Sequence, residues 1–288
     1  MNDTTTVVDT TLADATLADA RVRDARIRDA RMLAARWDAQ QTGYIRHRAE
    51  RFDTIARVVA AVCEGVDEPR ILDLAGGTGS LAARVLTAVP EGRAVVADKD
   101  PALLAIAADL ASADPRLTTA EVDLARPDWA EHPLIADAPF DAVVSSTALH
   151  WLQPGELVDV YRALPGILRP GGILLNGDHL AYDAHQEATL ARIARDDDAE
   201  MQESTFAGDT DTWDEWWQAV AESPRYAEAL RRRESVWGEA LHQAPPKVTL
   251  GFHLEALRSA GFTETGTVWR YLDDHVLYGI TPNAPVRA

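Results

Sequence analysis

Carboxylates and a glycine-rich turn are the residues of this chain whose types and spacing best suit binding of a polar ligand. Gly76, Gly77 and Gly79 follow an apolar run at residues 71–74, and glycine lets a backbone approach a ligand closely. Asp98 lies about 20 residues farther on, where a carboxylate at a strand end accepts hydrogen bonds from ribose hydroxyls. These residues predict a site for a nucleotide-like ligand.

The elements that must position these residues are alternating strands and helices. Short apolar segments typical of buried strands recur at residues 71–74, 94–97, 120–124, 140–144 and 168–175. A helical pattern follows the turn at residues 80–89, and Asp100 and Pro101 suit the cap and first turn of another helix. The pattern predicts an open α/β sheet, in which ligands bind at the carboxyl ends of the strands.

The glycine turn alone is compatible with several classes of protein. A phosphate-binding P-loop requires Gly-Lys-Ser/Thr, and no lysine lies near the turn, so this class is excluded. The strict dinucleotide fingerprint requires a third glycine at a spacing that the chain lacks, but its looser form fits residues 77–82. A simple strand-to-helix turn in another α/β protein also fits.

The turn resembles the first motif of class I S-adenosylmethionine-dependent methyltransferases, which is an acid, a spacer and then Gly-x-Gly-x-Gly. Asp73 is the acid here, Gly77 and Gly79 match, and Ala75 replaces the first glycine. We expect this replacement to be mild, because a methyl group fits if the backbone of Ala75 stays in an ordinary conformational region.

Later segments resemble the same family in the same order. Residues 145–152 resemble its fourth motif, and residues 168–175 resemble its entry into strand five. Residues 265–271 and 276–280 read as a hairpin, which a dinucleotide-binding dehydrogenase domain would not need. The resemblance implies a Rossmann-like α/β fold with a seven-stranded, mostly parallel sheet, a C-terminal antiparallel hairpin, helices on both faces and a helical lid. Within the family, the chain resembles the trans-aconitate and ubiquinone-biosynthesis group.

The resemblance implies S-adenosylmethionine as the cofactor and S-adenosylhomocysteine as its product. The glycine turn is then expected to take the methionine end, Asp98 the ribose and Asp123 the adenine, with two serines near the transferred methyl. The cofactor-binding residues that follow are Asp73, Ala75, Gly76, Gly77, Thr78, Gly79, Asp98, Lys99, Asp123, Leu124, Ser145 and Ser146.

Methyl transfer from a sulfonium requires positioning more than chemical assistance, so no metal or covalent nucleophile is expected. A neutral hydroxyl or a protonated amine as acceptor requires a base. His150 and His179 both follow strands at the expected ligand edge and are the candidates, although each also fits a packing role. Tyr44 is a candidate to close the site over the sulfonium or, alternatively, to pack a cap onto the sheet. A carboxylate acceptor would need no base.

Residues 181–250 read as an insertion that forms a lid over the acceptor. The capping box at Thr212 and Glu215 starts a helix whose tryptophans share one face with Val220. These tryptophans either form the lid's own core or contact the acceptor. The residues expected to line the acceptor side or the lid are Trp151, Trp213, Trp216, Trp217 and His253.

The chain divides into three expected parts. Residues 1–36 form an Ala/Arg/Asp-rich extension with a five-residue repeat, which cannot place its apolar residues on one helical stripe; we expect a partly ordered helix, with a pentapeptide solenoid as the alternative. Residues 37–66 form a helical cap that resembles those folding over the cofactor. Residues 67–288 form the methyltransferase domain with its lid.

Composition limits the partners. The formal net charge of −18 argues against nucleic acid, which requires a basic surface. No apolar run approaches the ~20 residues of a membrane span, and the first residues lack the features of a secretion signal. One cysteine, Cys63, excludes an internal disulfide. We therefore expect a cytoplasmic protein with a small-molecule acceptor; the oligomeric state is open, with a homodimer as one option.

Three functions follow, in order of preference. The first is methyl transfer from S-adenosylmethionine to an oxygen, nitrogen or carbon of a small molecule. The second is another reaction of the same cofactor, such as cyclisation by intramolecular displacement on the sulfonium, which would use the same binding residues and release methylthioadenosine. The third is a regulatory protein that binds the cofactor without catalysis.

Overall fold

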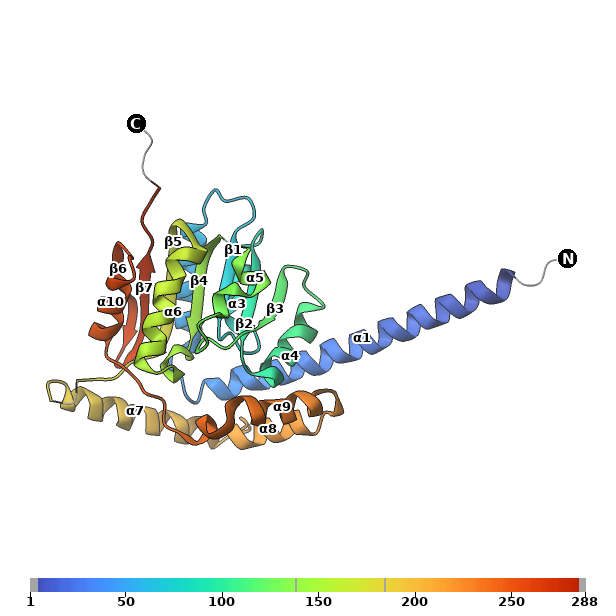
Figure 1. Cartoon of the computed structure of the whole chain (residues 1–288). Coiled ribbons are helices and arrows are strands. Elements are labelled where there is room, and N and C mark those ends of the chain that lie inside the picture. The colour runs from blue at the N-terminus through green and yellow to red at the C-terminus, as the bar shows by residue number, and fades with distance from the viewer. Residues whose placement is uncertain (1–4, 138, 184, 285–288) are drawn as a thin grey trace.

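A seven-stranded sheet with the order β3-β2-β1-β4-β5-β7-β6 forms the centre of the molecule (Figure 1). The computed structural model describes residues 5–137, 139–183 and 185–284. Strand β7 runs antiparallel to β5 and β6, whereas the strands from β3 to β5 are parallel. The predicted fold class is therefore confirmed. The strands are β1 Arg70–Leu74, β2 Arg93–Asp98, β3 Leu117–Glu121, β4 Phe140–Ser146, β5 Leu168–His179, β6 Glu264–Tyr271 and β7 Asp274–Ile280.

Helices cover both faces of the sheet, because each strand presents apolar side chains alternately to the two sides. Helices α2 (Arg48–Val62), α3 (Ser80–Ala88) and α4 (Pro101–Ala111) lie on one face. Helices α5 (Pro133–Ala136), α6 (Pro154–Ile167) and α10 (Leu250–Ser259) lie on the other. The short 3-10 helices are η1 Trp129–Glu131, η2 Leu149–Trp151, η3 Pro224–Tyr226 and η4 Gly238–His242.

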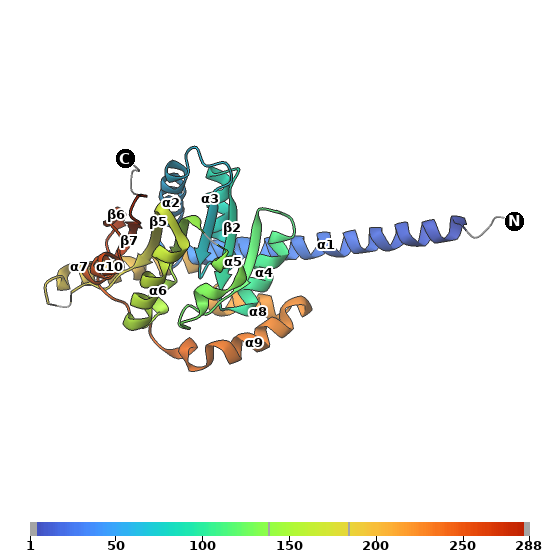
Figure 2. The ribbon, with the colours of Figure 1, turned by 45° about the horizontal axis from the view of Figure 1, so that its top comes forward.

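Helix α1 (Thr5–Gln41) is continuous, and its N-terminal part extends away from the sheet (Figures 1 and 2). The five-residue repeat therefore lies within a helix, and the helix crosses residues 36 and 37, where an extension and a cap were expected to meet, without a break. Ile27, Ala30 and Leu33 are buried, so the helix docks on the domain by its C-terminal half. Residues 1–4 of the predicted extension lie outside the described part of the chain.

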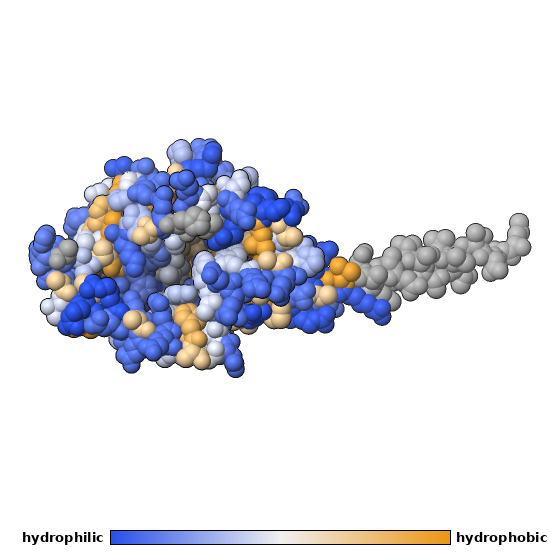
Figure 3. All heavy atoms as spheres, turned by 90° about the horizontal axis from the view of Figure 1, so that it is seen from below, coloured by the Kyte–Doolittle hydropathy of each residue, from blue (hydrophilic) through white to orange (hydrophobic). Residues whose placement is uncertain are grey.

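Three further helices run along the carboxyl edge of the sheet, at the bottom of Figure 1. They are α7 (Ala188–Phe206), α8 (Trp213–Ala221) and α9 (Ala227–Trp237), and they make up the predicted lid. The capping box at Thr212 and Glu215 is present and begins α8. The lid side of the molecule is mostly hydrophilic, with apolar residues in small separate patches (Figure 3). No helix in the described ranges has the length and apolar character needed to cross a membrane.

The predicted boundary of one strand was wrong. Strand β3 lies about three residues earlier than predicted, because Leu117–Glu121 pair with β2 and place Glu121 beside Asp98. Helix α7 continues through the acidic run at residues 196–198. Helix α10 begins at Leu250, since the hydroxyl of Thr249 accepts a hydrogen bond from the amide of Phe252.

Candidate active site

The glycine turn is shaped by the carboxylate of Asp73, which is fully buried at the end of β1. Its Oδ2 accepts a hydrogen bond from the amide of Ala82 at 3.0 Å, which ties the strand to the first turn of α3. A Cβ on Gly76 would lie 2.7 Å from the Asp73 carboxyl carbon, so only glycine fits there. Gly77 and Gly79 have φ angles of 56° and 83°, a left-handed conformation that glycine adopts without strain.

The carboxylate of Asp73 lies beneath the glycine turn and not at its surface. Burial raises its pKa to about 7, against the hydrogen bond from Ala82, which lowers it. Its Oδ1 has no hydrogen-bond partner in the described structure. The carboxylate predicted as a cofactor residue therefore holds the loop in shape from below.

Ala75 corrects an expectation about the first motif. Its φ is 51°, so the backbone lies in the left-handed region and not in the ordinary region that would make the loss of glycine mild. A non-glycine residue there costs of order 1 kcal/mol or more. The loop keeps the conformation of a glycine at this position although the residue is alanine.

Replacing Ala75 by glycine is expected to raise the free energy of unfolding by up to about 1 kcal/mol, because relief of the left-handed strain exceeds the entropic cost of a new glycine. The measurement is urea unfolding followed by circular dichroism. Ala83→Gly is the matched control, since Ala83 is an exposed residue of α3 and glycine in a helix costs about 1 kcal/mol. If both variants lose stability equally, Ala75 is not strained.

The side chain of Asp98 connects the glycine turn after β1 to the segment that follows β2. Its Oδ2 accepts a hydrogen bond from the amide of Gly77 at 2.8 Å, and its Oδ1 accepts one from the amide of Asp100 at 2.8 Å. Asp100 in turn caps α4, as predicted, through the amides of Ala102 and Leu103. A carboxylate 6% exposed therefore stands at the end of the strand next to the glycine turn, where it suits a pair of ribose hydroxyls.

Cofactor affinity is expected to depend on the ionisation of Asp98. Burial raises its pKa to about 6, and the charge of Asp100 adds to this against hydrogen bonds from the Asp100 and Gly77 amides. If the bound state requires the charged carboxylate, affinity should level off above about pH 7 and fall as the pH drops through 6. A loss of about tenfold between pH 7 and pH 5 follows from a single proton. Titration calorimetry with S-adenosylhomocysteine measures it, and Asp98→Asn should remove the dependence.

The predicted adenine residues lie beyond β3. The carboxylate of Asp123 accepts a hydrogen bond from the amide of Ala125 at 3.0 Å, and Leu124 is buried in the core. Lys99 follows Asp98, and its Nζ lies 4.0 Å from the ring centroid of Trp237 in the lid. Lys99 is therefore held against the lid at the rim of the site.

Ser145 and Ser146, at the end of β4, point to opposite faces of the sheet, as consecutive strand residues must. The hydroxyl of Ser145 donates to the carbonyl of Leu74 at 2.8 Å and is fully buried. The hydroxyl of Ser146 accepts a hydrogen bond from the buried guanidinium of Arg51 at 2.8 Å. Arg51 also pairs with Asp274 at 2.7 Å, so the α2 helix is fastened to the ends of β4 and β7.

His150 and Asp178 form a close pair at the carboxyl edge. The ring Nδ1 of His150 lies 2.5 Å from Oδ1 of Asp178, and the His150 amide donates to Oδ2. Burial by itself raises the pKa of Asp178, but the charges of His150 and Arg51 outweigh burial and hold that pKa at about 2. A carboxylate that is always charged keeps a proton on Nδ1, which leaves Nε2 free to accept one.

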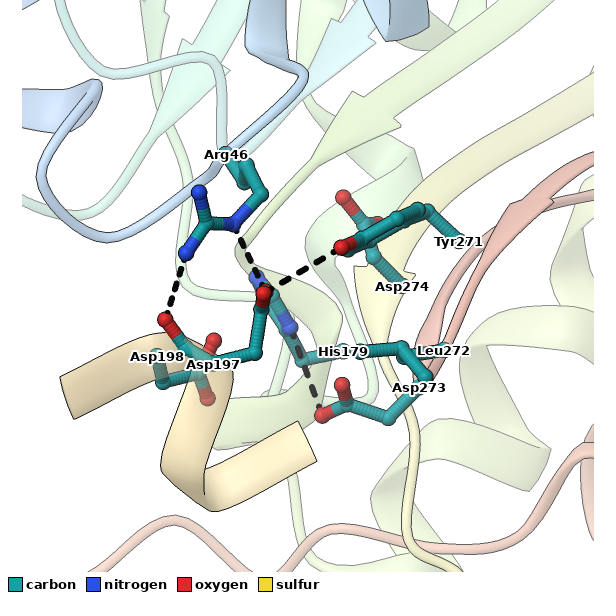
Figure 4. Close-up of a pocket in the computed structure, with 8 residues that line it drawn as sticks. All are labelled: Arg46, His179, Asp197, Asp198, Tyr271, Leu272, Asp273 and Asp274. Atoms are coloured by element: carbon teal, nitrogen blue, oxygen red, sulfur yellow. Dashed lines mark hydrogen bonds and ion pairs between the residues drawn. The ribbon is translucent and has the colours of Figure 1, made fainter. Parts of the chain in front are cut away.

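His179, the other candidate base, pairs through its ring with a different carboxylate from the one that holds His150. Its backbone amide donates to Asp178, but its ring Nδ1 lies 3.4 Å from the carboxylate of Asp273. Burial lowers its pKa, but the hydrogen bond with Asp273 and the charge of Asp274 outweigh burial and raise it. Figure 4 shows the ring directed toward Asp273 in a small acidic pocket.

The acidic pocket is closed by contacts between three parts of the chain (Figure 4). Arg46, from the turn after α1, donates from Nε to Asp197 of α7 at 2.6 Å. The hydroxyl of Tyr271, from the hairpin, donates to the same Asp197 at 3.2 Å. Asp198 also lines the pocket, and burial raises its pKa. The lid is thus latched to the hairpin beside the candidate site.

The other predicted residues lie at contacts between elements. His253 is buried against Tyr161, whose hydroxyl lies 2.7 Å from its Nδ1, and burial lowers its pKa to about 4; it belongs to the core beneath the site. The ring of Tyr44 packs on Phe206 of the lid, with centroids 5.4 Å apart. Trp151 is 39% exposed.

The lid tryptophans form a core together with α1 and α4, a larger unit than the lid alone. Trp216 is fully buried and donates from Nε1 to the carbonyl of Leu33 at 3.0 Å. The ring of Trp37 lies 4.6 Å from that of Trp216 and 5.7 Å from that of Trp213. Trp217 lies in the same group. These side chains attach the lid to the N-terminal helix.

Three residues of the site were not singled out from sequence. Arg51 is buried, Asp178 orients His150, and Trp237 contacts Lys99. A lone arginine on an otherwise apolar helix face was the available signal for Arg51. Asp178 and Trp237 carried no local signal, since their partners lie far away in the chain.

Comparison with known proteins agrees with this geometry. Residues 71–172 match the family described as Methyltransferase domain. No curated protein sequence matches the chain. Among solved structures, an O-methyltransferase family protein from Burkholderia thailandensis is 18% identical with a TM-score of 0.52, over 80% of this chain and 55% of that one. The CurJ carbon methyltransferase is 15% identical with a TM-score of 0.51, over 80% and 53%.

The fold is that of class I methyltransferases, as predicted. Within it, residues 71–172 match the methyltransferase domain family, in line with the predictions of an enzyme and of S-adenosylmethionine as cofactor. The chain spans about half the length of the two solved structures. The narrower resemblance to the trans-aconitate and ubiquinone-biosynthesis group stays a prediction.

Proposed function

We propose that the protein transfers the methyl group of S-adenosylmethionine to a small-molecule acceptor. The observation that carries the proposal is the glycine turn held by Asp73 and bonded through Gly77 to the carboxylate of Asp98. This turn leaves β1 between β2 and β4, where the chain order reverses and where ligands bind in open α/β sheets.

The residues present fit this cofactor. A Cβ at Gly76 would collide with Asp73, so glycine lets the turn pack onto β1, and the absence of side chains at Gly76 and Gly77 lets its backbone approach the methionine part. Asp98 would hold the ribose and Asp123 the adenine. When bound, S-adenosylmethionine supplies a methyl group that is already activated on a positively charged sulfur. The chain's task is to orient the acceptor and to exclude water.

For an acceptor that must lose a proton, His150 is the candidate general base. Asp178 fixes its ring through Nδ1 at 2.5 Å, and Nε2 would accept the proton. His179 is the second candidate, but its ring is held by Asp273 among four aspartates. A carboxylate acceptor would need neither histidine as a base.

The lid, residues 181–250, and the turn carrying Tyr44 would enclose the acceptor. Contacts of α7 with Arg46 and Tyr271 support this role, because they bring the lid over the ends of β5 and β7. Residence in the cytoplasm is part of the same proposal, since a chain with one cysteine has no need of an oxidising compartment.

The first experiment is incubation of the protein with S-adenosylmethionine, with and without a panel of small hydroxyl, amine and carboxylate compounds. We expect S-adenosylhomocysteine only when an acceptor is present. Methylthioadenosine without an acceptor would instead indicate intramolecular displacement. If calorimetry at high protein concentration gives no heat with either S-adenosylmethionine or S-adenosylhomocysteine, use of this cofactor is ruled out.

A further inference from the structure

Trp237, at the end of α9, contacts residues that follow both of the strands beside β1. On one side its ring lies 4.0 Å from Nζ of Lys99, which follows β2. On the other side its centroid is 5.9 Å from that of Trp151, which follows β4. Strands β2 and β4 are the two neighbours of β1. One lid side chain therefore reaches across the carboxyl end of β1, from which the turn emerges.

Two polar contacts fasten this part of α9 to the rim of the site. The indole Nε1 of Trp237 donates to Oδ2 of Asp100 at 2.9 Å, and Nε of Arg233 donates to the same oxygen at 2.7 Å. The side chain of Asp100 is nearly inaccessible, and the side chain of Arg233 is only 12% exposed. The Asp100 amide is bonded to Asp98, so the fastening point is two residues from the candidate ribose carboxylate.

Other contacts hold the earlier part of α9. Leu230 packs against the core that contains Trp216, and the guanidinium of Arg233 lies 3.8 Å from the ring centroid of Trp217. No residue of the helix is buried, and Arg232 pairs with Glu121 at the surface, where exposed pairs contribute about 0–1 kcal/mol. The contacts of Trp237 with Asp100 and Trp151 are therefore the ones that hold the C-terminal end of this helix at the rim of the site.

We propose that Trp237 is the roof of the cofactor compartment and that its contacts with Asp100 and Lys99 set the rate of cofactor exchange. The proposal rests on the proposed function, because it assumes that Asp98 and the glycine turn hold the cofactor. A ligand held there lies beneath the Trp237 ring, and it leaves only after the ring and the Arg233 pair move away. Release of S-adenosylhomocysteine is then slow relative to an open site.

The test is the dissociation rate of tritiated S-adenosylhomocysteine, measured by a chase with unlabelled compound. Trp237→Ala is expected to raise the rate at least tenfold, and Trp237→Phe, which keeps a ring but loses the N–H, less than that. Trp269→Ala is the matched control, because Trp269 is a partly exposed tryptophan of β6 whose Nε1 donates to Glu50 of α2 at 3.0 Å, outside the lid. It should leave the rate within twofold of wild type.

A second measurement compares the protein without and with ligand. Hydrogen exchange of the α9 amides is expected to accelerate in ligand-free Trp237→Ala and to slow in wild type when S-adenosylhomocysteine is added. An unchanged dissociation rate in Trp237→Ala, or an equal increase in Trp269→Ala, would overturn the roof assignment while leaving cofactor binding intact. If wild type does not bind the compound at all, the proposed function fails instead.

Discussion

Replacing His150 by alanine is expected to lower kcat by roughly 10²–10⁴-fold for an acceptor that must lose a proton, the range typical of a lost general base. Affinity for S-adenosylhomocysteine should stay within about twofold, because the His150 ring is bonded to Asp178 and, within the described residues, not to Asp98 or the glycine turn. The measurement is release of S-adenosylhomocysteine with the acceptor found by panel screening, alongside calorimetry of cofactor binding.

Asp178→Asn tests whether the pair acts as a unit. The carboxylate accepts from Nδ1 of His150 at 2.5 Å and from its backbone amide. An amide NH₂ placed against Nδ1 would favour the opposite tautomer, with the proton on Nε2 where it blocks proton acceptance. We expect kcat to fall nearly as far as in His150→Ala, and the double variant to lose little more than either single variant.

His179→Ala is the control that separates the two candidate bases. Its ring is bonded to Asp273, and the strand places it on the opposite face from Asp178. Full activity in this variant together with loss in His150→Ala supports the assignment. The reverse result would transfer the role of base to His179. Full activity in both variants would indicate a carboxylate acceptor.

Asp98→Ala is expected to weaken S-adenosylhomocysteine binding by about 100-fold or more. Hydrogen bonds to a charged group contribute about 1.5–3 kcal/mol each, and Asp98 offers a nearly buried carboxylate at the candidate ribose position. Calorimetry measures the change. Unchanged affinity would refute the ribose assignment.

Part of this loss could come through the turn, since Asp98 also holds the amide of Gly77. A second ligand separates the two contributions. Wild type should bind the 2′-deoxy analogue of S-adenosylhomocysteine more weakly than the parent compound, whereas Asp98→Ala should bind both equally. A coupling of at least about 1 kcal/mol in this cycle indicates direct contact with the ribose. If wild type and Asp98→Ala prefer the parent compound over the 2′-deoxy analogue to the same extent, Asp98 supports the loop and does not contact the ribose.

The order of elements was predictable because it depends on local physics. Glycines that adopt left-handed angles, Asp100 and Pro101 at a helix start, and Thr212 with Glu215 at another each act within a few residues. Apolar strands separated by helical patterns imply a parallel sheet. The family motifs then placed the carboxylates at one edge of that sheet, as the structure has them.

The sequence pattern predicted a wrong strand boundary where pairing with a distant strand determines which residues are extended. Residues 120–124 are apolar enough to predict a strand, but the segment that pairs with β2 is Leu117–Glu121. Residues 122–124 are then free to turn into the core. An alanine at position 75 likewise predicted an ordinary backbone conformation, but the loop that connects β1 to α3 has Ala75 at a φ of 51°.

The sequence by itself determined the class of fold, the glycine turn and the carboxylates around it, because each depends on residues near one another in the chain. Only the tertiary structure decided which side chains act together. It pairs His150 with Asp178 and His179 with Asp273, and it places Trp237 over Lys99. Such partners are 28 to 138 residues apart, and strand alternation and lid packing, which no short motif encodes, bring them together.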